Sequence, residues 1–141
     1  MKRVTGIGGI FFKSDDPEST QKWYRNHLGI KSGEYGGTFE WRHVNNKNKK
    51  GYTAWSIFPE KTEYLNPSNK DFMVNYRVND LEKLLAVLKE EGIEIIGEME
   101  EFEYGKFGWI MDPNGVKIEL WEPNDEAYAK MGDEDSTNKS S

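Results

Sequence analysis

The chain has 141 residues, which is enough for one domain with a buried core. Charged residues make up 31% of it and the net charge is −6, so the composition argues against nucleic-acid binding. It has no cysteine, which excludes disulfides and thiolate metal ligands, and no apolar run of membrane-spanning length or signal-peptide type. We therefore expect a cytoplasmic protein without a membrane or nucleic-acid partner.

The first half of the chain predicts a strand, a helix and further strands. The apolar residues 4–14 indicate the strand. Asp16 followed by Pro17 is typical of a helix start, and Gly29 is typical of its end. Strands are then expected near residues 32–35, 38–44 and 52–58.

The second half predicts the same order of elements. Residues 72–78 alternate between two faces, as a strand does. A helix follows that Asp80 opens and that also shows a capping-box pattern of Asn79 with Glu82. It has four leucines on one face and ends at Gly92. Three strands are expected at about 94–102, 106–111 and 116–122.

Short motifs recur at a constant spacing and support an internal duplication. Gly29-Ile30 recurs as Gly92-Ile93, and the run starting at Ile57 recurs at Leu120, each 63 positions later. We predict an α+β fold of two βαβββ modules, at about 4–60 and 70–123, that form a curved mixed sheet with helices on one face. Residues 61–69 would link them within one domain, 1–123, and the polar, acidic residues 124–141 would form a flexible tail.

The order of elements and three motifs resemble the vicinal oxygen chelate superfamily, which includes glyoxalase I, extradiol dioxygenases, fosfomycin-resistance enzymes and bleomycin-resistance proteins. The resemblance spans roughly residues 5–123 and implies the glyoxalase/bleomycin-resistance fold. It identifies no single activity, because the superfamily hosts many. The motifs lie in residues 11–17 with 23–24 and 28–30, in residues 76–81, and in residues 112–120.

The resemblance also implies where metal ligands would lie in the metal-dependent members. Each module would place a His or Gln on its first strand and a carboxylate on its last strand. Those positions fall at Gly9, Met73, Ser56 and Glu119, of which only Glu119 matches. His27 and His43 lie at none of these four positions. We therefore predict no metal or other cofactor, although a divalent metal stays an alternative.

Glu119 has two interpretations at this point. It can be half of a solvated Lys–Glu pair on an open sheet face. Alternatively, it can line a pocket, where it would accept hydrogen bonds from a ligand or act as a base. The resemblance places it in the pocket and makes it the candidate catalytic residue.

Two functions follow. The first is binding of a small organic molecule in a cup-shaped, metal-free pocket on the concave side of the sheet. The alternative is a lyase, isomerase or dioxygenase-type enzyme with a reduced or non-standard metal site, using Glu119 or Glu40. A homodimer is expected because sheet edges and aromatic residues need cover, and the cup can close within one chain or across the dimer. The candidate ligand-binding residues are Gly9, Phe11, Ser56, Phe58, Met73, Asn75, Arg77, Lys117, Glu119 and Trp121.

Overall fold

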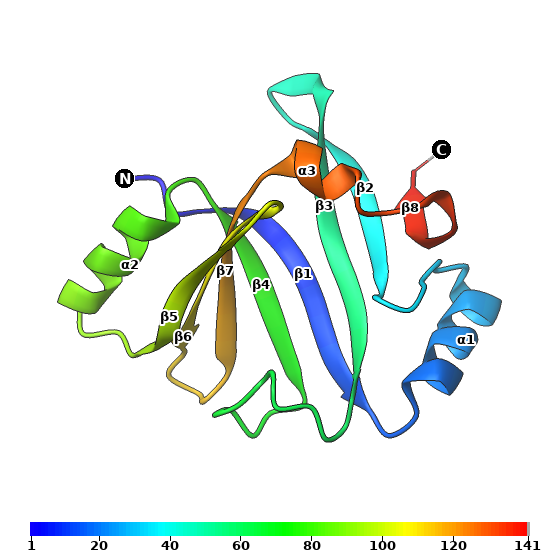
Figure 1. Ribbon diagram of the computed structural model, residues 1–141, viewed down its shortest axis with the longest axis horizontal. Helices are drawn as coiled ribbons and strands as arrows, with labels where there is room; N and C mark the ends of the chain where they lie inside the picture. The colour runs from blue at the N-terminus through cyan, green and yellow to red at the C-terminus, as the bar shows by residue number, and fades with distance from the viewer. Residues whose placement is uncertain (141) are drawn as a thin grey trace.

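The computed structural model describes residues 1–140, which form one eight-stranded mixed sheet with helices (Figure 1). The first module contains β1 (Val4–Ser14), α1 (Pro17–Leu28), β2 (Gly37–His43) and β3 (Asn46–Pro59). The second contains β4 (Phe72–Val78), α2 (Leu81–Glu90), β5 (Ile95–Phe102), β6 (Gly105–Met111) and β7 (Lys117–Pro123). The remaining elements are α3 (Asp125–Ala129), a 3₁₀ turn η1 (Glu134–Ser136) and β8 (Thr137–Lys139).

The boundaries of the two long helices follow from the residues that end them. The Asp16 side chain accepts a hydrogen bond from the backbone of Ser19 at the start of α1. Asp80 does the same for Lys83 in α2. Gly29 and Gly92 adopt left-handed backbone angles, φ 70° and 81°, just after the two helices. The predicted helix starts at Asp16 and Asp80 and the ends at Gly29 and Gly92 are confirmed. The predicted capping box of Asn79 and Glu82 is wrong, because the Asp80 side chain caps α2.

The strand order β5-β6-β7-β4-β1-β3-β2-β8 confirms the duplicated plan. β1 pairs with β3 in parallel, and β4 pairs with β7 in parallel. The two modules join through the antiparallel pair β1–β4 in the middle of the sheet, where Ile10 lies opposite Val74. Both modules of one chain therefore build one continuous sheet.

The outer strands of the first module differ from the prediction. The expected strand at 32–35 is absent, and that segment makes only an isolated bridge between Gly33 and Gly36. The edge beside β2 is instead occupied by β8 from the end of the chain, as Figure 1 shows. Thus the segment expected to be a flexible tail contains α3, η1 and β8, which the sequence analysis did not predict.

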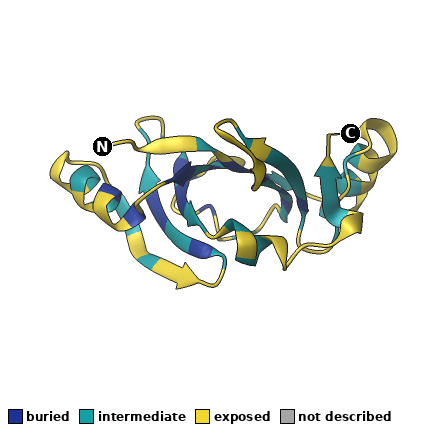
Figure 2. Ribbon diagram, turned by 90° about the horizontal axis from the view of Figure 1, so that it is seen from above, coloured by how far each residue is buried: buried dark blue, intermediate teal, exposed yellow. Residues whose placement is uncertain are grey.

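The sheet is curved, and different elements pack against its convex and concave faces. In Figure 2 it bends around an interior, and α1 and α2 lie outside it at opposite ends. Leu81 and Leu84 of α2 are buried against Leu120 of β7. A second apolar cluster, on the concave face, contains Phe11, Leu65, Met73 and Trp109.

No helix in residues 1–140 has both the length and the apolar character needed to cross a membrane.

Candidate functional site

A cavity of about 470 Å³ opens on the concave face of the sheet. The first module contributes Phe11, Ala54 and the loop at 33–37, and the second contributes Asn75, Phe107, Glu119 and Trp121. The C-terminal segment supplies part of the wall from Tyr128 to Ser136. The cavity therefore lies between the two modules of one chain. We call it the central cavity.

Aromatic rings form much of the wall. Phe107 stacks on Trp121 with ring centroids 5.8 Å apart and planes 9° apart. Trp121 also contacts Tyr128, at 5.3 Å, and Phe11 stacks on Phe58 at 5.6 Å. Such rings give a rigid apolar surface suited to a flat organic molecule.

Glu119 is the buried charged residue of the wall, with an exposed fraction of 3%. Its Oε1 accepts a hydrogen bond from Asn75 Nδ2 at 2.7 Å. Its Oε2 accepts hydrogen bonds from Trp109 Nε1, at 2.9 Å, and from the hydroxyl of Tyr64. Three neutral donors therefore hold this carboxylate in place, which excludes the solvated pair as its environment.

Two ionisable neighbours of Glu119 respond to this environment. Partial burial raises the pKa of Tyr64, and the charge of Glu119 and the hydrogen bond to it raise it further. Burial lowers the pKa of Lys117, against the opposing effect of Glu119 and Glu100. Lys117 Nζ donates to the backbone oxygen of Tyr64 at 2.6 Å, close to the rings of Tyr64 and Trp109.

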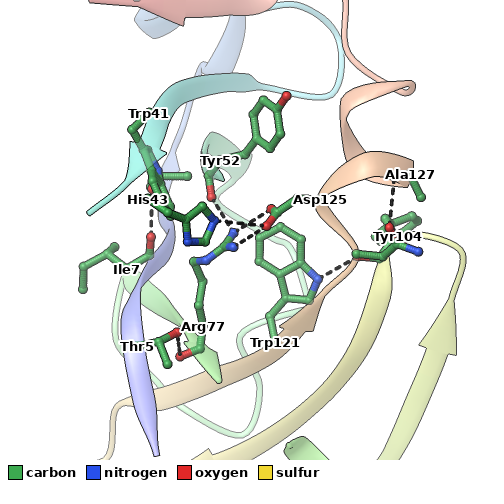
Figure 3. A network of polar contacts seen from close by, with 12 residues as sticks. Thr5, Ile7, Trp41, His43, Tyr52, Arg77, Tyr104, Trp121, Asp125 and Ala127 are labelled. Atoms are coloured by element: carbon green, nitrogen blue, oxygen red, sulfur yellow. Dashed lines mark hydrogen bonds and ion pairs between the residues drawn. The ribbon is translucent and has the colours of Figure 1, made fainter. Parts of the chain in front are cut away.

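A second polar cluster ties the C-terminal segment to the sheet (Figure 3). Arg77, whose side chain is only 4% exposed, makes two hydrogen bonds to Asp125 of α3, at 3.0 and 2.6 Å. Its guanidinium group lies 4.9 Å from the ring of Trp41 and 5.3 Å from that of Trp121. His43 Nε2 lies 3.7 Å from Asp125 Oδ2. This cluster holds α3 beside the central cavity.

The positions that the resemblance associates with metal ligands have other surroundings here. A Cβ atom on Gly9 would lie 2.6 Å from the tip of the Phe11 ring, so that ring fills the space of a larger side chain. Met73 is fully buried in the apolar cluster, and Ser56 Oγ faces the backbone of Tyr35. Within residues 1–140, no three His, Asp or Glu side chains come together as a metal site. These side chains do not fit a divalent metal.

The structure brings some of the predicted site residues together and leaves others outside the wall. Phe11, Asn75, Glu119 and Trp121 line the central cavity. The remaining six are on or near the concave face but are not among the lining residues: Gly9, Ser56, Phe58, Met73, Arg77 and Lys117.

The alternative acid-base group Glu40 lies outside the cavity wall. It pairs with Arg42 at 3.3 Å and Lys50 at 3.7 Å. Burial acts to raise its pKa, but the hydrogen bond from Arg42 and the charges of Lys50, Lys139 and Arg42 lower it overall. Glu40 therefore forms ion pairs within the β2–β3 hairpin and does not contact the central cavity.

Several residues of the site were missed by the sequence analysis. Tyr64 comes from the segment predicted to be a linker, and it reaches Glu119 across 55 positions of sequence. Tyr128 comes from the predicted tail and bonds Thr38 at 2.7 Å. A local pattern carries no signal for such contacts. A signal did exist for Tyr104, Phe107 and Trp109, because three aromatic residues within six positions are compatible with a ligand site. The sequence did not show on which face of the sheet each ring lies.

The family model for the Glyoxalase/Bleomycin resistance protein/Dioxygenase superfamily matches residues 6–120. Because this match covers most of the chain, the protein belongs to that superfamily. It is thus a glyoxalase/dioxygenase-like protein, and members of this group bind small-molecule ligands. No curated protein matches the chain.

Solved structures share the fold at low sequence identity. Methylmalonyl-CoA epimerase from Mycobacterium tuberculosis is 20% identical with a TM-score of 0.60, covering 89% of this chain and 93% of that one. The epimerase from Streptomyces coelicolor is 16% identical with a TM-score of 0.61, covering 85% and 98%. A Legionella pneumophila structure described as an NAD-dependent benzaldehyde dehydrogenase is 14% identical with a TM-score of 0.53, covering 82% and 98%. At these identities the likeness extends to the fold alone.

Proposed function

We propose that this protein binds a small, flat organic molecule in the central cavity without a metal ion. The proposal depends on what occupies two of the positions where metal-dependent members would have ligands. The Phe11 ring covers Gly9, and both oxygens of Glu119 are bonded to protein donors. A metal would have to displace these donors and would find one carboxylate ligand, whereas an organic molecule meets aromatic walls.

A thermal-shift screen with small aromatic compounds tests the proposal, because a bound ligand adds stability by mass action. The test variant is Ala54→Phe, which puts a phenyl ring into the cavity from its wall and should block ligand binding. We expect compounds that raise the melting temperature of the wild type to have no effect on this variant. The control is Ala86→Phe, on the exposed side of α2, which should respond like the wild type. Equal responses of both variants would place binding elsewhere.

The second candidate is an enzyme of the same superfamily that uses Glu119 with a reduced or non-standard metal site. The enclosed position of this carboxylate in the cavity wall favours it. Glu119→Gln separates the two functions. An enzyme that uses the carboxylate in chemistry would lose turnover and keep its affinity for substrate.

We further propose a homodimer and a cytoplasmic location. Ile7, Ile10 and Phe72 lie on the outer face of the central β1–β4 pair, and they are 43%, 38% and 45% exposed. Ile10 lies opposite its equivalent Val74, so the patch is close to symmetric and suits a two-fold contact. Light scattering should give a dimer mass for the wild type and a monomer mass for Ile10→Lys. Val44→Lys, in the exposed hairpin, is the control. A wild-type monomer would contradict the dimer, and cell fractionation tests the location.

A further inference from the structure

Glu119 makes no direct ion pair within residues 1–140. Its hydrogen-bond donors are an amide, an indole and a phenol, all of them neutral. An enclosed carboxylate without an opposite charge in direct contact is costly, and a cation brought next to it gains correspondingly.

Lys117 is the nearby cation that the Glu119 charge attracts, but it makes no direct ion pair with Glu119. It lies two residues earlier on the same face of β7. Its Nζ is directed to the backbone oxygen of Tyr64 and lies near the aromatic rings of Tyr64 and Trp109. It is not among the residues that line the central cavity. A ligand therefore meets the carboxylate without meeting the ammonium group.

The other charges of the cavity wall have the same sign. Glu34 and Asp133 line it together with Glu119, and no Lys, Arg or His is among the lining residues. Like charges around one cavity raise the local concentration of cations and repel anions. The rings of Phe11, Phe107 and Trp121 in the same wall suit an apolar body.

A carboxylate with three hydrogen bonds keeps room for a further donor. Ionised carboxylates accept about four hydrogen bonds in total, and Asn75 is the sole protein donor to Oε1. A protonated amine is a donor with a full charge, so its hydrogen bond to a carboxylate is about twice as strong as a neutral one.

We infer that the ligand of the central cavity is an organic cation, a protonated amine or ammonium compound with an aromatic or apolar body, whose nitrogen lies at Glu119. This inference rests on the proposed function, because it concerns the same cavity. It also separates this cavity from one that takes a carboxylate-bearing or phosphate-bearing substrate, which the three acids would repel.

Calorimetric titration with three probes of one carbon skeleton tests the inference: phenylpropylamine, phenylpropanol and phenylpropionate. We expect the amine to bind at least about tenfold more tightly than the alcohol, and the anion to bind most weakly. Glu119→Gln keeps an acceptor and the shape of the side chain but removes its charge. It should weaken binding of the amine about tenfold and binding of the alcohol, which carries no charge, by much less. Glu90→Gln, an exposed acid on α2, makes the same change in net charge and should alter neither.

The outcomes test separately whether the ligand is a cation and whether the central cavity binds a small molecule at all. Equal binding of amine and alcohol, or tighter binding of the anion, would overturn the organic cation and leave the small-molecule cavity in place. Failure of all three probes to bind, with no hit in the thermal-shift screen, would overturn both. The comparison among probes uses the wild-type protein, so it stays decisive if Glu119→Gln does not fold.

Discussion

The two modules share a frame but present different chemistry to the cavity between them. On the concave face of the first module lie Gly9, Phe11 and Ser56. Their equivalents in the second module are Met73, Asn75 and Glu119. The carboxylate of Glu119 and its amide donor Asn75 thus lie in the second module. The first module supplies two small residues and the aromatic ring of Phe11. The duplication preserved the sheet while the two inner faces diverged.

The largest expected effect comes from the buried cation of the second module. Arg77→Met would remove both hydrogen bonds to Asp125, leaving it only His43 at 3.7 Å, and would release α3 from the sheet. Loss of one member of a buried pair costs about 3–5 kcal/mol, so we expect the free energy of unfolding to fall by this order. Urea unfolding followed by tryptophan fluorescence measures it. Arg3→Met breaks the exposed pair with Glu91 and should change little. Equal losses in both variants would contradict the role of the Arg77 cluster.

The next largest effect on stability tests whether the Phe11 ring fills the space above Gly9 in the first module. In Gly9→Ala the new methyl group would meet the Phe11 ring at 2.6 Å, so the ring must shift out of its stack on Phe58. Overpacking of this kind costs about 1–3 kcal/mol. Gly6→Ala is the control, because its nearest side-chain atom lies 3.9 Å away.

A double variant sharpens this result. Adding Phe11→Ala to Gly9→Ala removes the clash, so the two losses of unfolding free energy should sum to more than the loss in the double variant. Strict additivity would show that the ring does not occupy the space above Gly9.

A smaller effect appears at alkaline pH. The pKa of Tyr64 is raised in the folded protein above the value of about 10 for an unfolded chain. The stabilising contribution of the protonated phenol is complete below pH ~10 and is lost as the pH rises through the folded pKa. Because solvent reaches part of the ring, the decline should be less than the ~1.4 kcal/mol per pH unit of a fully shielded group.

Denaturant unfolding between about pH 9 and 11 measures this decline, and Tyr64→Phe should flatten it. Tyr35→Phe is the control, since Tyr35 is 91% exposed. An unchanged slope in Tyr64→Phe would place the titrating group elsewhere.

The smallest effect concerns the C-terminal segment. Tyr128→Phe removes the hydrogen bond to Thr38, which should cost about 0.5–1.5 kcal/mol. Thr38→Val removes the same bond, so the two losses should be similar and should not add in the double variant. Hydrogen exchange of the β2–β8 amides would report whether the loss is local. Full additivity would contradict a shared bond.

Local patterns predicted the parts of the fold that depend on neighbours in sequence. Asp16 with Pro17, the leucines of α2 and the alternation in β4 each act within a few residues, and each was confirmed. The repeat placed Ser56 and Glu119 at equivalent positions, and the pairing of β1 with β3 and β4 with β7 agrees.

Contacts between distant segments could not be predicted in this way. The residues near 32–35 were expected to be a strand, but the edge of β2 is taken by β8. That pairing is fixed by Asn138, whose side chain bonds Lys31 and Thr38 about a hundred positions away. Tyr64 reaches Glu119, and Tyr128 reaches the cavity wall, from segments without apolar periodicity. Their roles depend on tertiary packing, which overrides local propensity.

Metal binding tests the central claim most directly. Untagged protein should be titrated calorimetrically with Mn²⁺, Ni²⁺ and Zn²⁺, and its metal content measured after purification. The proposal predicts well under one equivalent of any divalent metal and no saturable binding at the central cavity. Stoichiometric binding that disappears in Glu119→Gln, but persists in Glu90→Gln, would contradict it.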